Sequence, residues 1–227
     1  MATQTATPGV TQAPVRTHSK SFSERFVDWI NAHRQLSYWI GTILLVAVAL
    51  FVWQLSTKRR SEEIANRDLQ SARFAFENQN LPLAASELAK VVENYSNTDA
   101  AEEARLLLGN ARLLQGQPQQ AIEVLRDYAP GAGRAFRWQA YGLLGAAYEN
   151  LGRFREAAEA YENGSEAGRL DFQKAQLLSE AGRAWTSAGD TTKAIAAYRK
   201  ILKDFSKEGI VTEARVRLGE LTKGAAS

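Results

Sequence analysis

The stretch Tyr141-Gly-Leu-Leu144-Gly145-Ala-Ala-Tyr148, followed by Gly152, Ala157 and Tyr161, decides the fold of this chain. Its large, small and aromatic residues recur at the spacing of two short helices joined by a turn. Gly145 and Ala157 let the paired helices approach closely, while the aromatic residues fill the space between one hairpin and the next. Gly152 falls at the turn, where a left-handed backbone costs glycine little. The stretch therefore predicts a helical hairpin.

The same frame recurs on both sides of this stretch. The equivalent small residues follow one another at spacings of 37, 36, 37 and 37, and they are Ala72, Gly109, Gly145, Gly182 and Gly219. This period resembles the tetratricopeptide repeat, in which stacked hairpins bury a continuous core. We therefore predict an all-α fold, with a TPR-like soluble domain over residues 61–227. It would be a tetratricopeptide-like α-solenoid of about four helical hairpins plus a C-terminal capping helix.

An uncharged apolar segment precedes the repeats. Residues 35–57 contain no Asp, Glu, Lys or Arg. At about 1.5 Å per residue they are long enough to cross a hydrocarbon layer of roughly 30 Å. Aromatic and basic residues stand at both ends, as in a membrane anchor, and they are Tyr38, Trp39, Trp53, Lys58, Arg59 and Arg60. We predict one N-terminal transmembrane helix over residues 35–57.

Two shorter regions come before this segment. Residues 1–20 are rich in Thr, Ala, Pro and Gln and predict a disordered tail, although an acid-poor composition is also compatible with an organelle transit peptide. Residues 21–34 place Phe22, Phe26 and Trp29 on one helical face. This pattern favours an amphipathic interfacial helix over a plain continuation of the transmembrane helix.

The charge of the chain is divided between these regions. Residues 1–60 hold 7 Lys and Arg against 2 Asp and Glu, whereas residues 61–227 hold 21 against 23, which together give the net charge of +3. The basic charge therefore belongs to the tail and the membrane flanks, which argues against a nucleic-acid-binding domain. The basic residues on the two sides of the apolar segment nearly balance, so the charge rule alone does not assign the membrane orientation.

Residues that commonly perform catalysis or bind metals are scarce. The chain has no cysteine, and its two histidines, His18 and His33, both precede the apolar segment. The usual nucleophile–base pairs and zinc sites are therefore not expected, and Gly131-x-Gly133 lacks the lysine of a phosphate-binding loop. Acidic pairs such as Glu102-Glu103 are typical of a solvated helix face. We predict no enzymatic activity, no cofactor and no metal.

The arrangement resembles a bacterial family of single-pass membrane tetratricopeptide proteins, the ancillary Sec-translocon subunit (YfgM-like) family. Three features carry the resemblance: Phe26-Val-Asp-Trp29 before the membrane segment, Val52-Trp53 at its end, and repeats that begin soon after Arg60. The resemblance implies a bacterial inner-membrane location, with a cytoplasmic N-terminus and a periplasmic TPR domain. It also implies partners at the translocon and among envelope chaperones.

In such solenoids the first helix of each hairpin lines a concave groove. The frame of the repeats assigns eleven candidate protein-binding residues to this groove: Glu103, Leu106, Asn110, Leu113, Gln139, Ala146, Glu149, Gln176, Ser179, Arg183 and Thr186. Any of these positions is equally compatible with an ordinary solvated helix face.

These observations predict a non-enzymatic, membrane-anchored scaffold for protein–protein interaction. Its array would bind extracytoplasmic proteins near a membrane complex such as the Sec translocon, and residues 35–57 would contact the lipid bilayer and membrane helices of partners. The alternative is a structural accessory subunit that stabilises the assembly of a large photosynthetic or respiratory membrane complex. Nucleic acid is not an expected partner.

Overall fold

The computed structural model describes residues 21–223, and every regular element in this part of the chain is a helix. The tail predicted for residues 1–20 lies outside the described residues. Contacts divide the chain into two compact units, with the boundary between Leu55 and Ser56. The all-α class and the repeated-hairpin architecture predicted from the sequence are both confirmed.

The first unit contains α1 (Phe22–Ala32) and the beginning of α2 (Arg34–Glu77). Helix α1 lies within the predicted range 21–34. Phe22, Phe26 and Trp29 on this helix are exposed, and the Trp29 ring stacks on His33 with 5.3 Å between the ring centroids. The helix therefore presents exposed aromatic side chains along one face.

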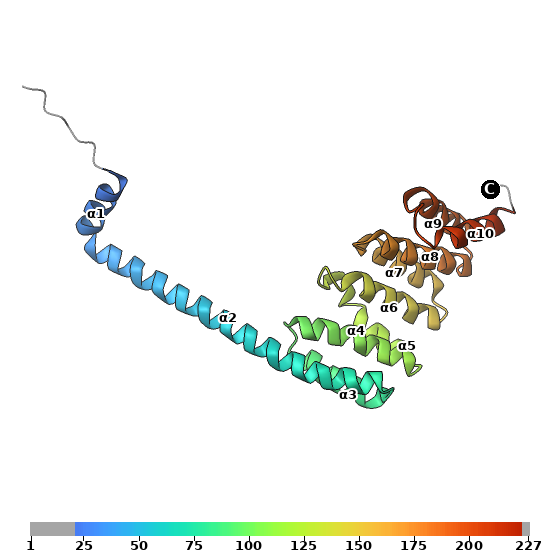
Figure 1. Ribbon diagram of the computed structural model, residues 1–227, viewed down its shortest axis with the longest axis horizontal. Helices are drawn as coiled ribbons and strands as arrows, with labels where there is room; N and C mark the ends of the chain where they lie inside the picture. The colour runs from blue at the N-terminus through green and yellow to red at the C-terminus, as the bar shows by residue number, and fades with distance from the viewer. Residues whose placement is uncertain (1–20, 224–227) are drawn as a thin grey trace, which may run out of the picture. The chain divides into compact units, whose positions relative to one another are not determined.

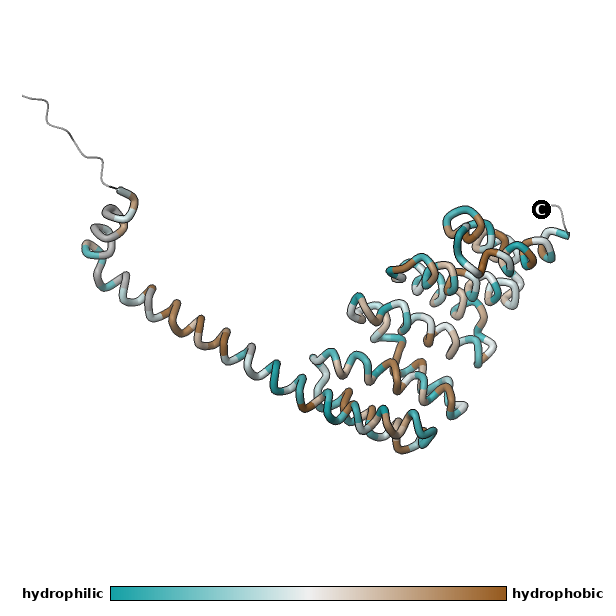
Figure 2. The backbone as a smooth tube through the Cα atoms, viewed as in Figure 1, coloured by the Kyte–Doolittle hydropathy of each residue, from teal (hydrophilic) through white to brown (hydrophobic). Residues whose placement is uncertain are grey.

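Helix α2 is continuous from Arg34 to Glu77. It is apolar and long enough to cross a membrane, by length and composition, and Figure 2 shows the hydrophobic run in its N-terminal part. The predicted transmembrane range 35–57 and the start of the predicted soluble domain at residue 61 both fall on this one helix. Residues 42–77 contain neither glycine nor proline, so no helix-breaking residue ends the apolar helix before the first repeat begins.

The second unit is an array of hairpins that follow one another in chain order (Figure 1). The C-terminal part of α2 pairs with α3, and α4 with α5, α6 with α7 and α8 with α9, which leaves α10 alone at the end of the array. This gives the four hairpins and the terminal helix that the sequence predicts. The bounds are α3 (Leu81–Asn94), α4 (Asp99–Leu114), α5 (Pro118–Leu125), η1 (Ala129–Gly131), α6 (Arg137–Asn150), α7 (Phe154–Ala167), α8 (Asp171–Ser187), α9 (Thr191–Asp204) and α10 (Val211–Thr222).

The glycines of the repeat frame mark close contacts between paired helices. A Cβ atom added at Gly145 would lie 2.6 Å from the Tyr161 ring. The same holds for the second and fourth hairpins, where Gly109 faces Leu125 and Gly182 faces Tyr198. At Gly219, which has no second helix after it, an added Cβ would meet nothing within 4 Å. The 36- to 37-residue period is thus a period of helix–helix packing.

The turns between paired helices repeat a left-handed residue. Gly116, Gly152 and Gly189 have φ values of 70°, 71° and 78°, and the equivalent residue of the first hairpin, Gln79, has φ 61°. A side chain makes this conformation costly, by about 1 kcal/mol. Gln79 therefore departs from the repeat at the position where glycine suits the turn best.

We expect Gln79→Gly to raise the free energy of unfolding by roughly 0.5–1 kcal/mol, because it removes the left-handed strain in the first turn. Chemical denaturation of the full-length protein in detergent, followed by circular dichroism, measures the change. Gly152→Ala is the converse control, since nothing lies within 4 Å of the added Cβ and only its backbone strain changes. A loss of stability on Gln79→Gly would contradict the assignment.

The segment between the second and third hairpins is fastened by hydrogen bonds. The Pro130-Gly-Ala-Gly133 sequence by itself favours a flexible break between these hairpins. Instead, the Gly133 N–H donates to the Glu102 carboxylate at 2.9 Å, and the Tyr128 hydroxyl donates to the Glu102 carbonyl at 3.3 Å. Arg137 donates twice to the Ala132 carbonyl, at 3.1 and 2.9 Å. These bonds fix where α6 begins relative to α4.

Candidate functional site: a groove between the second and third hairpins

A cavity of about 610 Å³ lies between α4 and α6, the first helices of the second and third hairpins. Most of its wall is apolar. Four of the predicted groove residues line it, and they are Glu103, Leu106, Asn110 and Gln139. The structure adds five residues that the repeat frame did not assign: Leu107, Phe136, Trp138, Gly142 and Leu143. We call this cavity the apolar groove.

The position of two of these added residues explains why the repeat frame did not assign them. Phe136 and Trp138 lie at the beginning of α6, next to the fastened 129–133 segment, and both are partly buried against the core. The repeat frame begins three residues later, at Tyr141, so counting along the frame passes over them. The nearest signal in the sequence is the pair of aromatic residues that directly follows the Pro130–Gly133 segment.

One end of the apolar groove is held by an ion pair. The Glu103 carboxylate contacts the guanidinium of Arg73 on α2, within the second unit. Leu106 is 7 % exposed and forms part of the floor rather than the rim. The groove thus combines an apolar floor with the polar groups of Glu103, Asn110 and Gln139. This is the usual composition of a site that binds an apolar side chain and hydrogen-bonds the chain that carries it.

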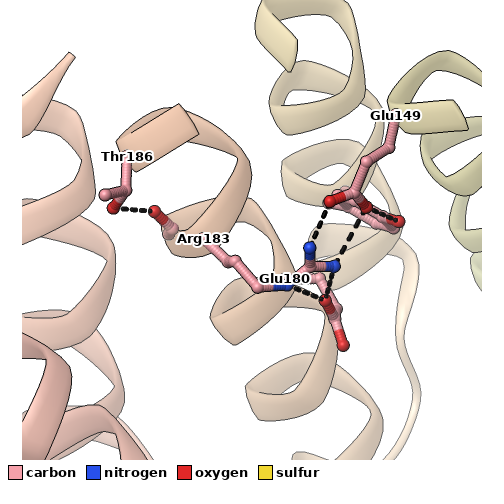
Figure 3. A network of polar contacts seen from close by, with 6 residues as sticks. Glu149, Glu180, Arg183 and Thr186 are labelled. Atoms are coloured by element: carbon pink, nitrogen blue, oxygen red, sulfur yellow. Dashed lines mark hydrogen bonds and ion pairs between the residues drawn. The ribbon is translucent and has the colours of Figure 1, made fainter. Parts of the chain in front are cut away.

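Two of the predicted groove residues of the later hairpins, Glu149 and Arg183, form a polar network instead (Figure 3). Glu149 on α6 receives both terminal nitrogens of Arg183 on α8, one of them at 2.9 Å. Arg183 also donates through Nε to Glu180 at 3.0 Å. All three guanidinium nitrogens of Arg183 are therefore engaged with carboxylates that belong to the array itself.

The polar network also includes a residue of α7. The Tyr161 hydroxyl on α7 donates to Glu149 at 3.1 Å. Burial, followed by the charge of Glu149, raises the pKa of Tyr161 above its ordinary value. The hydrogen bonds that Arg183 donates to the Glu149 carboxylate are the main cause that raises the pKa of Arg183. The network therefore joins α6, α7 and α8.

The other predicted groove residues lie apart from the apolar groove. Thr186 is exposed and donates to the Gly182 carbonyl of its own helix at 2.8 Å. Gln176 is exposed, Ala146 and Leu113 are half-buried, and Ser179 is only 6 % exposed.

The predicted membrane-anchor residues are all exposed. About two-thirds of the surface is exposed in the aromatic members, Tyr38, Trp39 and Trp53. The basic members Lys58, Arg59 and Arg60 are also exposed.

No metal centre is formed in the described part of the chain. Residues 21–223 contain no group of three or more His, Cys, Asp or Glu side chains placed to hold a metal ion. The organised features of the array are the apolar groove and the polar network. Of these, the apolar groove is suited to contact with another macromolecule, because Arg183 in the polar network is already engaged within the array.

Comparison with solved structures returns the same fold. The TPR-like repeats of a kinesin light chain protein from Podosopora anserina, and a single-substitution variant of them, each superpose with a TM-score of 0.56 at 18% identity. Each match covers 70% of this chain and 85% of the other. At this identity the likeness concerns the fold alone. No curated protein matches the sequence significantly.

Comparison with protein families is more specific. The pattern of the tetratricopeptide repeat family matches residues 172–207, which cover all of α8 except its first residue, the following turn and α9. The pattern of the tetratricopeptide repeat-like domain family matches residues 47–178, which is more than half of the chain and includes the apolar groove. The chain therefore belongs to the tetratricopeptide repeat-like domain family.

Proposed function

We propose that this protein is a membrane-anchored scaffold whose array binds extracytoplasmic proteins near a membrane complex such as the Sec translocon. Tetratricopeptide repeats are protein-interaction modules, so a scaffold is the role that the family itself supports. The observation that carries the proposal is the apolar groove, because an apolar cavity on a repeat array offers a partner side chain a place to be buried.

The membrane anchor rests on α2. The exposed apolar side chains between Ile40 and Val52 have no cover from other described residues, and hydrocarbon would cover them. Exposed aromatic residues at both ends and the Lys58–Arg60 run match the residues that flank membrane spans. Placement in a bacterial inner membrane, with the array in the periplasm, extends the resemblance of residues 26–60 to single-pass translocon-associated proteins.

We expect Trp138→Ala to weaken partner binding by about 2 kcal/mol, close to thirtyfold, because a buried tryptophan is the commonest energetic centre of an interface. The full-length chain and the variant are each captured from native membranes in a gentle detergent, and bound proteins are quantified by mass spectrometry. The matched control is Phe74→Ala, since Phe74 is 71 % exposed and does not line the apolar groove. Equal recovery from both variants would exclude the groove as the binding surface.

The same capture experiment identifies the class of partner. Translocon subunits and envelope chaperones recovered in modest yield are the expected result for an adaptor. Recovery of one large photosynthetic or respiratory complex at fixed stoichiometry would replace this function with that of a structural subunit.

A further inference from the structure

A second cavity lies at the edge of the array where α6 and α8 begin. Its volume is about 520 Å³, and four basic residues line it against one acidic residue, Glu166. This excess of positive charge is local, because residues 61–227 as a whole hold 21 Lys and Arg against 23 Asp and Glu. We call it the basic pocket, and its basic residues are Arg134, Arg137, Arg169 and Lys174.

The basic pocket leaves cationic groups available. Within residues 21–223, neither Arg134 nor Arg169 forms an ion pair through its guanidinium, in contrast to Arg183. Arg137 is turned to the Ala132 carbonyl, and Lys174 lies 3.8 Å from Asp171, at the long end of an ion pair. The two unpaired arginines are therefore the groups most available to a ligand.

The helix end beside the pocket does not itself require a ligand. The backbone N–H groups of Arg169 and Leu170 donate to the Gln173 side chain at 2.9 and 3.1 Å. The attraction for an anion comes from the arginine side chains, whose forked donors match carboxylate groups.

We propose that the basic pocket binds acidic side chains of the partner that occupies the apolar groove. The inference rests on the proposed function and specifies the chemistry of the partner. It follows from charge complementarity, because paired carboxylates are the protein groups that two unpaired arginines bind best.

The position of the pocket favours a protein over a lipid headgroup. The short stretch 134–139 lines both cavities: Arg134 and Arg137 face the basic pocket, while Phe136, Trp138 and Gln139 face the apolar groove. One partner segment can therefore cross the beginning of α6 and contact both. Acidic side chains flanking an apolar anchor would occupy the two cavities together.

The test uses the full-length chain in neutral detergent and a fluorescein-labelled hexaglutamate peptide, with hexaglutamine as the uncharged probe. We expect hexaglutamate to bind and hexaglutamine not to bind. The double variant Arg134→Gln/Arg169→Gln should weaken hexaglutamate binding by about tenfold, as loss of two charge-assisted contacts predicts. Raising the salt concentration from about 0.05 to 0.5 M should weaken binding to the unaltered chain.

The matched control is Arg199→Gln/Arg215→Gln. It removes the same charge from two exposed arginines on α9 and α10 that line neither cavity. Equal weakening by the two double variants would mean that hexaglutamate responds only to net charge, and would overturn the proposal. A photoreactive hexaglutamate should cross-link within residues 134–137 or 166–174, and cross-linking confined to other segments would also overturn it.

Two further outcomes separate the alternatives. Mixed micelles containing photoreactive phosphatidylglycerol supply a lipid probe. If the Arg134→Gln/Arg169→Gln variant loses cross-linking to that lipid but keeps cross-linking to hexaglutamate, a lipid headgroup is the occupant and the proposal fails. If hexaglutamate does not bind while Trp138→Ala still lowers the recovery of the native partners, the basic pocket is excluded as a binding site for acidic side chains. The proposed function then stands.

Discussion

Replacing Gly145 with leucine is expected to lower the free energy of unfolding by about 3 kcal/mol, the upper end of the usual cost of overpacking a core. An added Cβ would lie 2.6 Å from Cδ1 and Cε1 of Tyr161, and leucine adds three more carbons in the same direction. Tyr161 is 4 % exposed and its hydroxyl holds Glu149, so its ring has little freedom to withdraw. The third hairpin should therefore open at the contact between α6 and α7.

Gly219→Leu is the matched control. Gly219 occupies the same position of the repeat frame on α10, but an added Cβ there meets nothing within 4 Å. Because leucine favours a helix more than glycine does, this variant should be neutral or slightly stabilising. Denaturant unfolding of the full-length chains measures both variants. Similar unfolding midpoints for both would show that the repeat frame does not mark the helix contacts.

Trp185→Ala is expected to cost about 3–5 kcal/mol, the usual loss for a large aromatic residue removed from a core. Trp185 on α8 is 0 % exposed and lies in the larger of the two apolar clusters. Its indole N–H donates to Glu162 at 2.8 Å, and the Lys193 ammonium lies 3.8 Å from the ring centroid. The substitution thus leaves a cavity and removes two polar contacts between neighbouring helices.

Two variants separate these contributions. Trp185→Phe retains most of the ring but loses the hydrogen bond, so it should cost about 1–2 kcal/mol. Phe172→Ala removes an aromatic side chain from the same helix at a position that is 50 % exposed, and it should change stability by less than about 0.5 kcal/mol. Thermal unfolding followed by circular dichroism ranks the three variants. A smaller effect for Trp185→Ala than for Phe172→Ala would contradict the packing described here.

The architecture of the array could be predicted from the sequence because the repeat is a local pattern. Gly109, Gly145 and Gly182 mark the close contacts, and each is matched by a large residue 16 positions later: Leu125, Tyr161 and Tyr198. Both members of each pair belong to one hairpin, so their spacing along the chain is sufficient to identify them. The uncharged segment before the repeats was equally clear, since length and hydropathy are properties of the sequence.

The candidate site was predicted only in part. Glu103, Leu106, Asn110 and Gln139 follow from the repeat frame and meet in the apolar groove. Glu149 and Arg183 also follow from the frame, yet they bind each other across 34 positions of sequence. No spacing rule within one hairpin distinguishes a residue that faces a partner from one that pairs with the next hairpin.

The sequence by itself determined the helical class, the period of the array, the glycine turns and the apolar helix, because each depends on neighbours within about forty residues. Only the tertiary structure decided how adjacent hairpins meet. The hydrogen bond from Gly133 to Glu102 sets the beginning of α6 against α4, and this setting opens the apolar groove beside Trp138. It also leaves Arg134 and Arg169 together at one edge. These contacts join separate hairpins through the packing of whole helices, and no local pattern of residues records that packing.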